Sequence, residues 1–137
     1  MATTAGIQLT SSLLSNAMSV NSSTSCMKAG TTADSLDQMD TGYVEIASGV
    51  AKELLNATTL GINKANKVYL CNESTDETYY IIVTVKTTVL GRLYAGDWMF
   101  IPWAAETTAS DIKITGVTGT NNLTYTLFHE GKTLVSV

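Results

Sequence analysis

Charged side chains are scarce in this chain of 137 residues. Lysine and arginine together number 8, aspartate and glutamate number 12, the net charge is −4, and charged residues make up 15% of the sequence. A typical soluble domain has about 25%. A basic nucleic-acid surface requires clustered lysines and arginines that neutralise phosphates. The composition excludes such a surface, and we expect no nucleic-acid partner.

Histidine and cysteine are rare as well. His129 is the single histidine, and Cys26 and Cys71 are the two cysteines. Two cysteines are too few for a disulfide scaffold, and the three residues lack the spacing of a zinc motif. A hydrolytic triad needs a nucleophile and an orienting carboxylate beside its histidine, and no nucleophile motif is present. We expect no enzymatic activity, no metal and no cofactor; whether Cys26 and Cys71 pair stays open.

Long apolar runs are also missing. No stretch approaches the roughly 18 apolar residues of a transmembrane helix. The segment Met1–Gly6 has neither the basic region nor the apolar run of a cleaved signal peptide. The sequence therefore predicts no membrane partner and no secretion by a cleaved signal.

Two groups of oxygen-bearing side chains lie in segments expected to be turns. Three aspartates recur every third residue in Asp34–Asp40, and four acidic or amide residues crowd Asn72–Glu77. Neither group has the alternating spacing of a calcium-binding loop. We interpret both as solvated turns and leave open a weak Ca²⁺ site in Asn72–Glu77.

Hydroxyl groups take the place of charges in this chain. It contains 22 threonines and 12 serines, and 45% of its residues are hydrophobic, which is enough to build a core at this length. Threonine is β-branched and favours the extended backbone. The composition therefore favours a folded β protein.

The first 40 residues carry most of the serines and only weak apolar alternation. We expect an extended arm over residues 1–40, with one helical turn at Asp34–Asp40. Ile7, Leu9 and Leu13 are the candidate contacts of this arm, since alternating apolar side chains suit the pockets of a partner sheet.

Short β-type runs dominate from Tyr43 onward. The clearest is Tyr79–Lys86, in which Ile81 and Val83 fall on one face and Thr84 on the other. Val50–Leu55 suits either a helix or a strand. Further strands are expected at Tyr43–Ser48, Lys67–Cys71, Asp111–Thr115 and Leu123–Leu127, with the last two joined as a hairpin. Seven or eight such strands predict an all-β, antiparallel β-sandwich that resembles a jelly roll and spans residues 41–137.

The segment Leu93–Trp103 contains both tryptophans and the single proline. As a strand it has Trp98 and Phe100 on one face and Met99 and Trp103 on the other, so both faces are apolar. Such a strand is either covered on both sides within its own chain or meets another chain. Both interpretations hold if Trp98 and Phe100 lie in the core and Trp103 reaches out. The candidate interface residues are Tyr94, Trp98, Met99, Phe100, Pro102 and Trp103.

The phrase Ala95–Pro102, together with Tyr43–Ala47, Lys67–Asn72 and Leu123–Tyr125, resembles the small β-sandwich virion structural proteins of tailed bacteriophages. These proteins decorate, cement or join the particle. The resemblance implies a structural protein that is made in the host cytoplasm and ends in the virion, where it contacts its own copies and other virion proteins such as the major capsid protein.

Two functions remain after these exclusions. The first is a non-enzymatic virion structural protein, of the capsid decoration or cement type or another component that stabilises the particle, which assembles through the aromatic segment and the arm. The second is a carbohydrate-binding or host-receptor-binding sandwich, in which Trp103 and Tyr94 form a stacking platform.

Overall fold

The computed structural model describes residues 36–59 and 64–133, together with four two-residue strands in the amino-terminal part of the chain. These short strands are β1 (Thr4–Ala5), β2 (Gln8–Leu9), β3 (Val20–Asn21) and β4 (Met27–Lys28). β1 pairs with β4 and β2 pairs with β3, and neither pair joins the sheets of the main domain.

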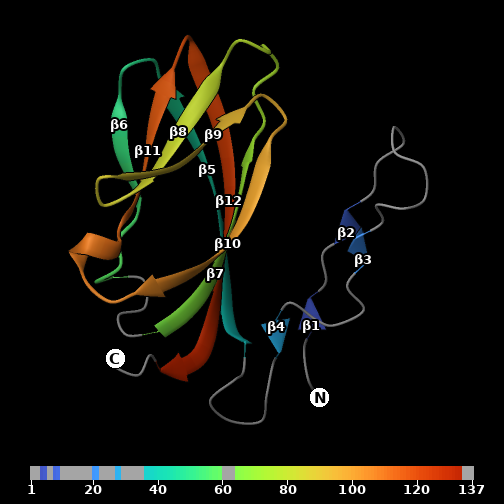
Figure 1. Cartoon of the computed structure of the whole chain (residues 1–137), viewed down its shortest axis with the longest axis vertical. Helices are drawn as coiled ribbons and strands as arrows, with labels where there is room; N and C mark the ends of the chain where they lie inside the picture. The colour runs from blue at the N-terminus through green and yellow to red at the C-terminus, as the bar shows by residue number, and fades with distance from the viewer. Residues whose placement is uncertain are drawn as a thin grey trace.

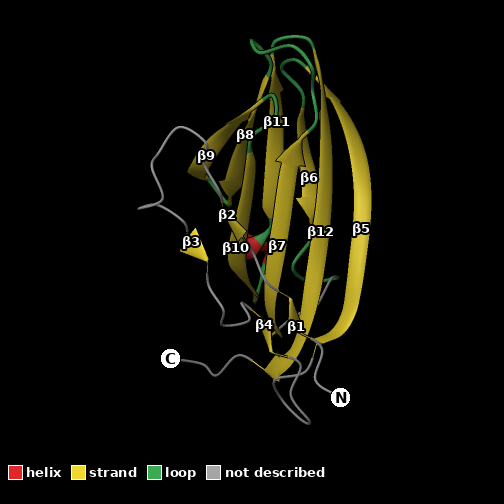
Figure 2. Cartoon of the chain, turned by 90° about the vertical axis from the view of Figure 1, so that its right-hand side faces the viewer, coloured by secondary structure: helices red, strands yellow, loops and turns green. Residues whose placement is uncertain are grey.

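The main domain consists of two four-stranded antiparallel sheets packed face to face (Figures 1 and 2). The first sheet has the strand order β10-β7-β12-β5, and the second has the order β6-β11-β8-β9. A 3₁₀ helix, η2 (Thr108–Ser110), follows β10. The strands are β5 (Leu36–Ala47), β6 (Ala51–Leu55), β7 (Lys64–Asn72), β8 (Tyr80–Val85), β9 (Thr88–Tyr94), β10 (Trp98–Ala105), β11 (Ile112–Val117) and β12 (Thr120–Thr133).

The pairing of these strands is nested. β8 pairs with β9, β7 with β10, β6 with β11, and β5 with β12. The chain therefore runs as one long hairpin that wraps into two sheets, and the wrapping adds the pairs β12–β7 and β11–β8. This arrangement is a jelly roll. The predicted all-β sandwich with jelly-roll character is confirmed.

Alternation along the strands places one face of each sheet in a shared core. In the first sheet Val68 and Leu70 of β7 lie beside Leu123 and Leu127 of β12, and all four are buried. The second sheet contributes Ile81, Val83, Ile112 and Ile114. The face predicted for Tyr79–Lys86 is thus confirmed.

The two sheets approach most closely where β11 meets the end of β5. A Cβ on Gly116 would lie 2.6 Å from the carbonyl oxygen of Ala47 and 2.9 Å from that of Ile46. Gly116 also donates its backbone N–H to Val50 and accepts from Gly49. Only glycine allows the two backbones to come this close.

Three local predictions differ from the structure. Leu36–Asp40 is strand rather than a helical turn, because β5 pairs with β12 along this length, and the predicted arm boundary at residue 40 falls inside β5. β11 and β12 do not form a hairpin, because each already has a partner on both sides in a different sheet. Ala51–Leu55, left open between helix and strand, is β6.

Candidate assembly face

The outward side of the first sheet is unusually apolar for a surface. Its three rows across β10, β7, β12 and β5 consist of Trp98, Cys71, Thr124 and Tyr43, then Phe100, Tyr69, Thr126 and Thr41, then Pro102, Lys67, Phe128 and Met39. We call these twelve residues the aromatic face. Lys67 is the one charged residue among them.

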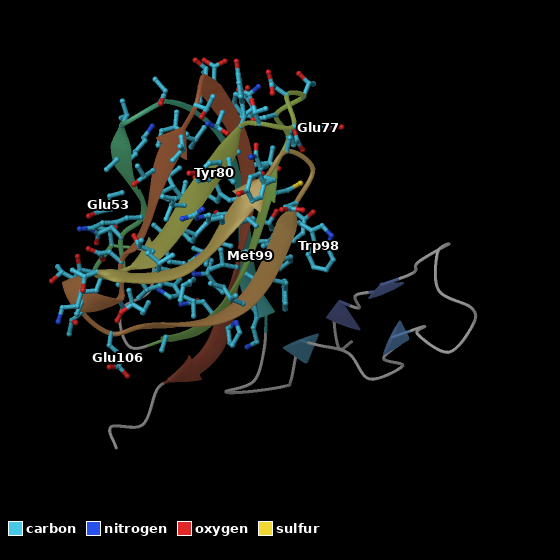
Figure 3. All side chains as sticks on the ribbon, turned by 45° about the horizontal axis from the view of Figure 1, so that its top comes forward. Glu53, Glu77, Tyr80, Trp98, Met99 and Glu106 are labelled. Carbon is cyan, nitrogen blue, oxygen red and sulfur yellow. The ribbon has the colours of Figure 1, made fainter. Side chains whose placement is uncertain are left out.

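Aromatic contacts link neighbouring strands of this face. The Tyr69 and Trp98 ring centroids lie 6.1 Å apart, and those of Phe100 and Phe128 lie 6.2 Å apart with an edge-on geometry. Such pairs contribute about 0.5–1.5 kcal/mol beyond the area they bury. The contacts hold the rings in fixed positions, but Trp98 remains 41% exposed. Figure 3 shows Trp98 extending away from the sandwich.

The rim of the face opposite β10 is also exposed and apolar. Met39 and Tyr43 on β5 are 60% and 56% exposed. Desolvation, then the carboxylates of Glu45 and Glu73, raises the pKa of Tyr43. Desolvation, then a hydrogen bond with Cys71, raises the pKa of Tyr69. Both phenols therefore stay neutral at physiological pH, and the charges near the face are those of Lys67 within it and of Glu45 and Glu73 at its edge.

The outward side of the second sheet has a different character. Arg92 and Ile82 are opposite one another on β9 and β8, and Lys113 of β11 is opposite Glu53 of β6. The guanidinium of Arg92 lies over the Tyr80 ring, 5.3 Å from its centroid. This side thus places charged groups among apolar ones, and β9 also exposes Val89, Leu90 and Tyr94.

The β9–β10 turn sets the position of Trp98. Asn72, at the end of β7, donates its backbone N–H to Asp97 and accepts from Gly96, at 2.9 and 2.7 Å. Gly96 has φ +85°, a left-handed value that favours glycine. The Asp97 carboxylate accepts the backbone N–H of Tyr94 at 2.9 Å. This closed turn fixes which residue begins β10 and therefore which side chains of β10 face outward.

The structure divides the predicted interface residues among three environments. Trp98, Phe100 and Pro102 lie together on the aromatic face, whereas Met99 faces inward and is packed against the core. Tyr94 lies on the outward side of the second sheet, 5.0 Å from the Tyr80 ring centroid. Their role as an interface stays a prediction.

The predicted orientation of the two tryptophans is wrong. Trp103 is 4% exposed and belongs to the core, while Trp98 and Phe100 point outward. Trp103 is in phase with Met99 and Ile101, and its indole Nε1 donates to the Ser110 carbonyl at 2.6 Å. Burial is therefore compatible with its polar atom. Trp103 and Tyr94 accordingly do not form a stacking platform.

The arm residues cannot be placed on this face. Ile7 and Leu13 lie outside the described residues, and Leu9 is described only as part of β2. Their proposed contacts stay a prediction. Whether Cys71 pairs with Cys26 stays open, because Cys26 lies outside the described residues.

Sequence reasoning named Trp98, Phe100 and Pro102 of the twelve residues of the aromatic face, and among those it missed are the large apolar side chains of Met39, Tyr43, Tyr69 and Phe128. A signal for Tyr69 was present, because it is out of phase with the apolar Val68 and Leu70 in one short strand. When the residues on both sides of a strand are apolar, each side is either buried within the chain or available to a partner.

The loop considered for Ca²⁺ has structural roles instead. Asn72 is fully buried and bonds backbone groups, while the Asp76 carboxylate accepts from the hydroxyl and the N–H of Thr78. These two hydrogen bonds lower the pKa of Asp76. Within residues 36–59 and 64–133, no group of three histidine, cysteine or acidic side chains is arranged to hold a metal ion.

Comparisons with known proteins add little. No protein-family model matches the chain, and no curated protein matches it. A solved structure described as "Bacillus endospore appendages form a novel family of disulfide-linked pili" is similar over 83% of this chain and 100% of its own, with 14% sequence identity and a TM-score of 0.39. At that level the likeness carries no conclusion about function. The described part of the chain contains no helix long and apolar enough to span a membrane.

Proposed function

We propose that this protein is a non-enzymatic structural subunit that assembles with other copies of itself through the aromatic face. The observation that carries the proposal is the contrast between the two outward sides of one sandwich. One side carries exposed Trp98, Tyr43 and Met39, with Lys67 as the one charged residue within its three rows and Glu45 and Glu73 at its edge. On the other side, Arg92, Lys113 and Glu53 lie among the exposed apolar residues. The support lies in the kind of side chain exposed, because Trp, Tyr and Met are enriched at interaction sites.

The dimensions of the face limit what it can do alone. Four strands about 4.8 Å apart and three rows about 7 Å apart cover on the order of 300 Å². A stable interface buries about 800 Å² on each partner. The aromatic face therefore gives a weak contact by itself, and a durable assembly needs many copies or a second contact.

We extend the proposal to the kind of assembly. The resemblance of Ala95–Pro102 to tailed-phage virion proteins supports a particle component, such as a capsid decoration or cement protein that meets the major capsid protein. The jelly roll, which viral capsid domains use, is compatible with it. Imaging of particles assembled with and without this protein tests this part, and particles of identical structure and stability in both preparations would reject it.

A matched pair of variants tests the aromatic face. Trp98 and Tyr94 are both aromatic and nearly equally exposed, at 41% and 43%, but lie on opposite sides of the sandwich. Sedimentation of the full chain over a range of concentrations should show reversible association, and Trp98→Lys should weaken it at least tenfold. Tyr94→Lys should leave it unchanged.

Two results would reject the aromatic face as an assembly surface. One is a monomer with concentration-independent melting, since association shifts apparent stability by mass action. The other is an equal loss of association in Trp98→Lys and Tyr94→Lys.

Glycan binding is the competing function, and the exposed Trp98–Tyr69 pair is the observation that favours it. A saturable change in tryptophan fluorescence on adding glycans, lost in Trp98→Phe, would replace the assembly proposal. If no glycan in a broad set changes the tryptophan fluorescence, the glycan-binding alternative is rejected.

A further inference from the structure

A second apolar feature lies beside the aromatic face. A groove of about 400 Å³ opens next to β10 at the side of the sandwich where η2 and the start of β9 lie. Its lining includes Val85, Leu90, Ile101, Pro102, Trp103 and Ala109, and contains no charged side chain. Leu90 is 45% exposed at its rim.

The groove runs along an unpaired sheet edge. β10 pairs with β7 on one side and has no strand on the other among the described residues. Asn72 bonds to Asp97, so the ladder alternation directs the backbone groups of Trp98, Phe100, Pro102 and Ala104 away from β7. Proline lacks an N–H, but at position 102 the N–H would point away from β7, so no hydrogen bond between β10 and β7 is lost. The other three residues still offer donors and acceptors to an added strand.

The amino-terminal arm has the chemistry that fits this groove. Residues 1–27 contain no aspartate, glutamate, lysine, arginine or histidine. Ile7 and Leu9 alternate with the polar Gln8 and Thr10, so an extended segment here has one apolar side and one polar side. An uncharged strand loses no charge hydration when it enters an uncharged groove.

The linker is long enough for the arm to reach another copy, and the small area of the aromatic face favours that copy as its source. The 22 residues from Leu14 to Ser35 can span roughly 70 Å when extended, well beyond the ~13 Å radius of gyration of a domain of this size. The aromatic face alone covers less area than a stable interface requires. A strand added along β10 extends the same contact region.

We propose that residues Ile7–Leu13 of one copy add to the free edge of β10 in another copy, with Ile7 and Leu9 in the groove between Leu90 and Trp103. This rests on the proposed function, since it supplies the second contact between assembling subunits. β2 pairs with β3, and β1 pairs with β4, over only two residues each. Such short two-stranded ladders are marginally stable in water, so the arm gives up both at little cost, and opening β1–β4 is what frees the full length of the linker.

Directed disulfide formation between two full-length chains tests this contact. Both chains carry Cys26→Ser and Cys71→Ser; one has Leu9→Cys with a small tag, and the other has Leu90→Cys with a large tag. After mixing and mild oxidation, the mixed-tag product should form at least tenfold faster than with Gln8→Cys, whose side chain points away from the groove. Ala109→Trp, which fills the groove from an exposed position, should suppress it, whereas Lys52→Trp on β6 should not.

Three results would overturn the inference. The first is an equal yield from Gln8→Cys and Leu9→Cys. The second is a faster reaction within one chain that carries both Leu9→Cys and Leu90→Cys at high dilution, because the arm then folds onto its own domain. The third is native mass spectrometry that shows a small apolar molecule in the groove and an unchanged cross-link in Ala109→Trp.

Failure of this contact is distinguishable from failure of the aromatic face. Trp98→Lys lies outside the groove lining, so it weakens association without changing the preference for Leu9→Cys over Gln8→Cys. A cross-link that forms while Trp98→Lys associates normally rejects the aromatic face and leaves the arm contact standing.

Discussion

The side-chain amide of Asn72 in the first sheet donates to the backbone carbonyl of Leu93 in the second sheet at 2.9 Å. Asn72 is fully buried, and its Oδ1 accepts the N–H of Ser74 at 3.1 Å. Its Nδ2 also donates to Oδ1 of buried Asn121 at 3.5 Å, and Nδ2 of Asn121 donates to the carbonyls of Val117 and Thr118. This polar group closes one end of the apolar core and joins the turns that begin β10 and β12.

Replacing Asn72 with leucine should destabilise the fold by about 2–4 kcal/mol. The leucine leaves the Leu93 carbonyl and the Ser74 N–H buried without partners, and each such group costs about 1–3 kcal/mol. Urea denaturation at a single protein concentration measures the loss. Thr75→Leu, at an exposed position in the same loop, should change stability by less than about 0.5 kcal/mol. Equal stability of the two variants would mean that Asn72 does not join the sheets.

Gly116→Ala should destabilise the protein by about 1–3 kcal/mol, the usual cost of overpacking. The added methyl group meets the carbonyl oxygens of Ala47 and Ile46 at 2.6 and 2.9 Å, and backbone cannot move aside as a side chain can. Gly91→Ala is the matched control, because its Cβ meets only the Met99 side chain at 3.6 Å. Thermal unfolding of both variants compares them, and a loss in Gly91→Ala equal to that in Gly116→Ala would contradict the close approach.

The two tryptophans should be distinguishable by fluorescence. Trp98→Phe leaves only Trp103, which is 4% exposed, and its emission should be blue-shifted and weakly quenched by acrylamide. Trp103→Phe leaves only Trp98, whose emission should be red-shifted and strongly quenched in dilute protein. Quenching of Trp98 should fall as the protein concentration rises, because association covers it. The reverse assignment of buried and exposed tryptophan would overturn the placement of β10.

The Asp76 carboxyl should titrate below its ordinary pKa of 3.8 in the folded protein, because the Thr78 side chain and N–H bond the ionised form. A folded pKa below the unfolded value means that this interaction stabilises the protein above about pH 4. The contribution disappears as the pH falls through the folded pKa. Thr78→Val keeps the N–H but removes the hydroxyl, so an NMR titration of Asp76 should show its pKa rising toward 3.8. An unchanged titration would show that the hydroxyl does not act.

Alternation within strands was predictable, and the partners of those strands were less so. The face formed by Ile81 and Val83 follows directly from the period of 2. The hairpin predicted between Asp111–Thr115 and Leu123–Leu127 failed although Thr118 and Gly119 have the positive φ values that hairpin turns favour, because β11 and β12 lie in different sheets and each pairs with two strands of its own sheet. Which strand pairs with which depends on long-range wrapping, and local sequence does not encode it.

The site was partly predictable for a related reason. Leu93–Trp103 was identifiable because the residues on both sides of its strand are apolar. Such a pattern does not indicate which side faces the core. The sign lies in the register: Met99 is opposite Leu70 and Trp103 is opposite Asn66, both on the core side of β7. The burial of Asn72 could have been predicted in the same way, because Asn72 lies on the same side of β7 as the buried Val68 and Leu70.

The last strand in chain order among the described residues occupies an interior position in its sheet. β12 lies between β7 and β5 and carries Thr124, Thr126 and Phe128, the middle column of the aromatic face. A chain still attached to the ribosome, with residues 120–133 not yet released, therefore has neither a closed first sheet nor a complete binding surface. On the proposed function, a chain therefore becomes competent to join other copies only once residues 120–133 are free to pair, which limits premature association of nascent chains.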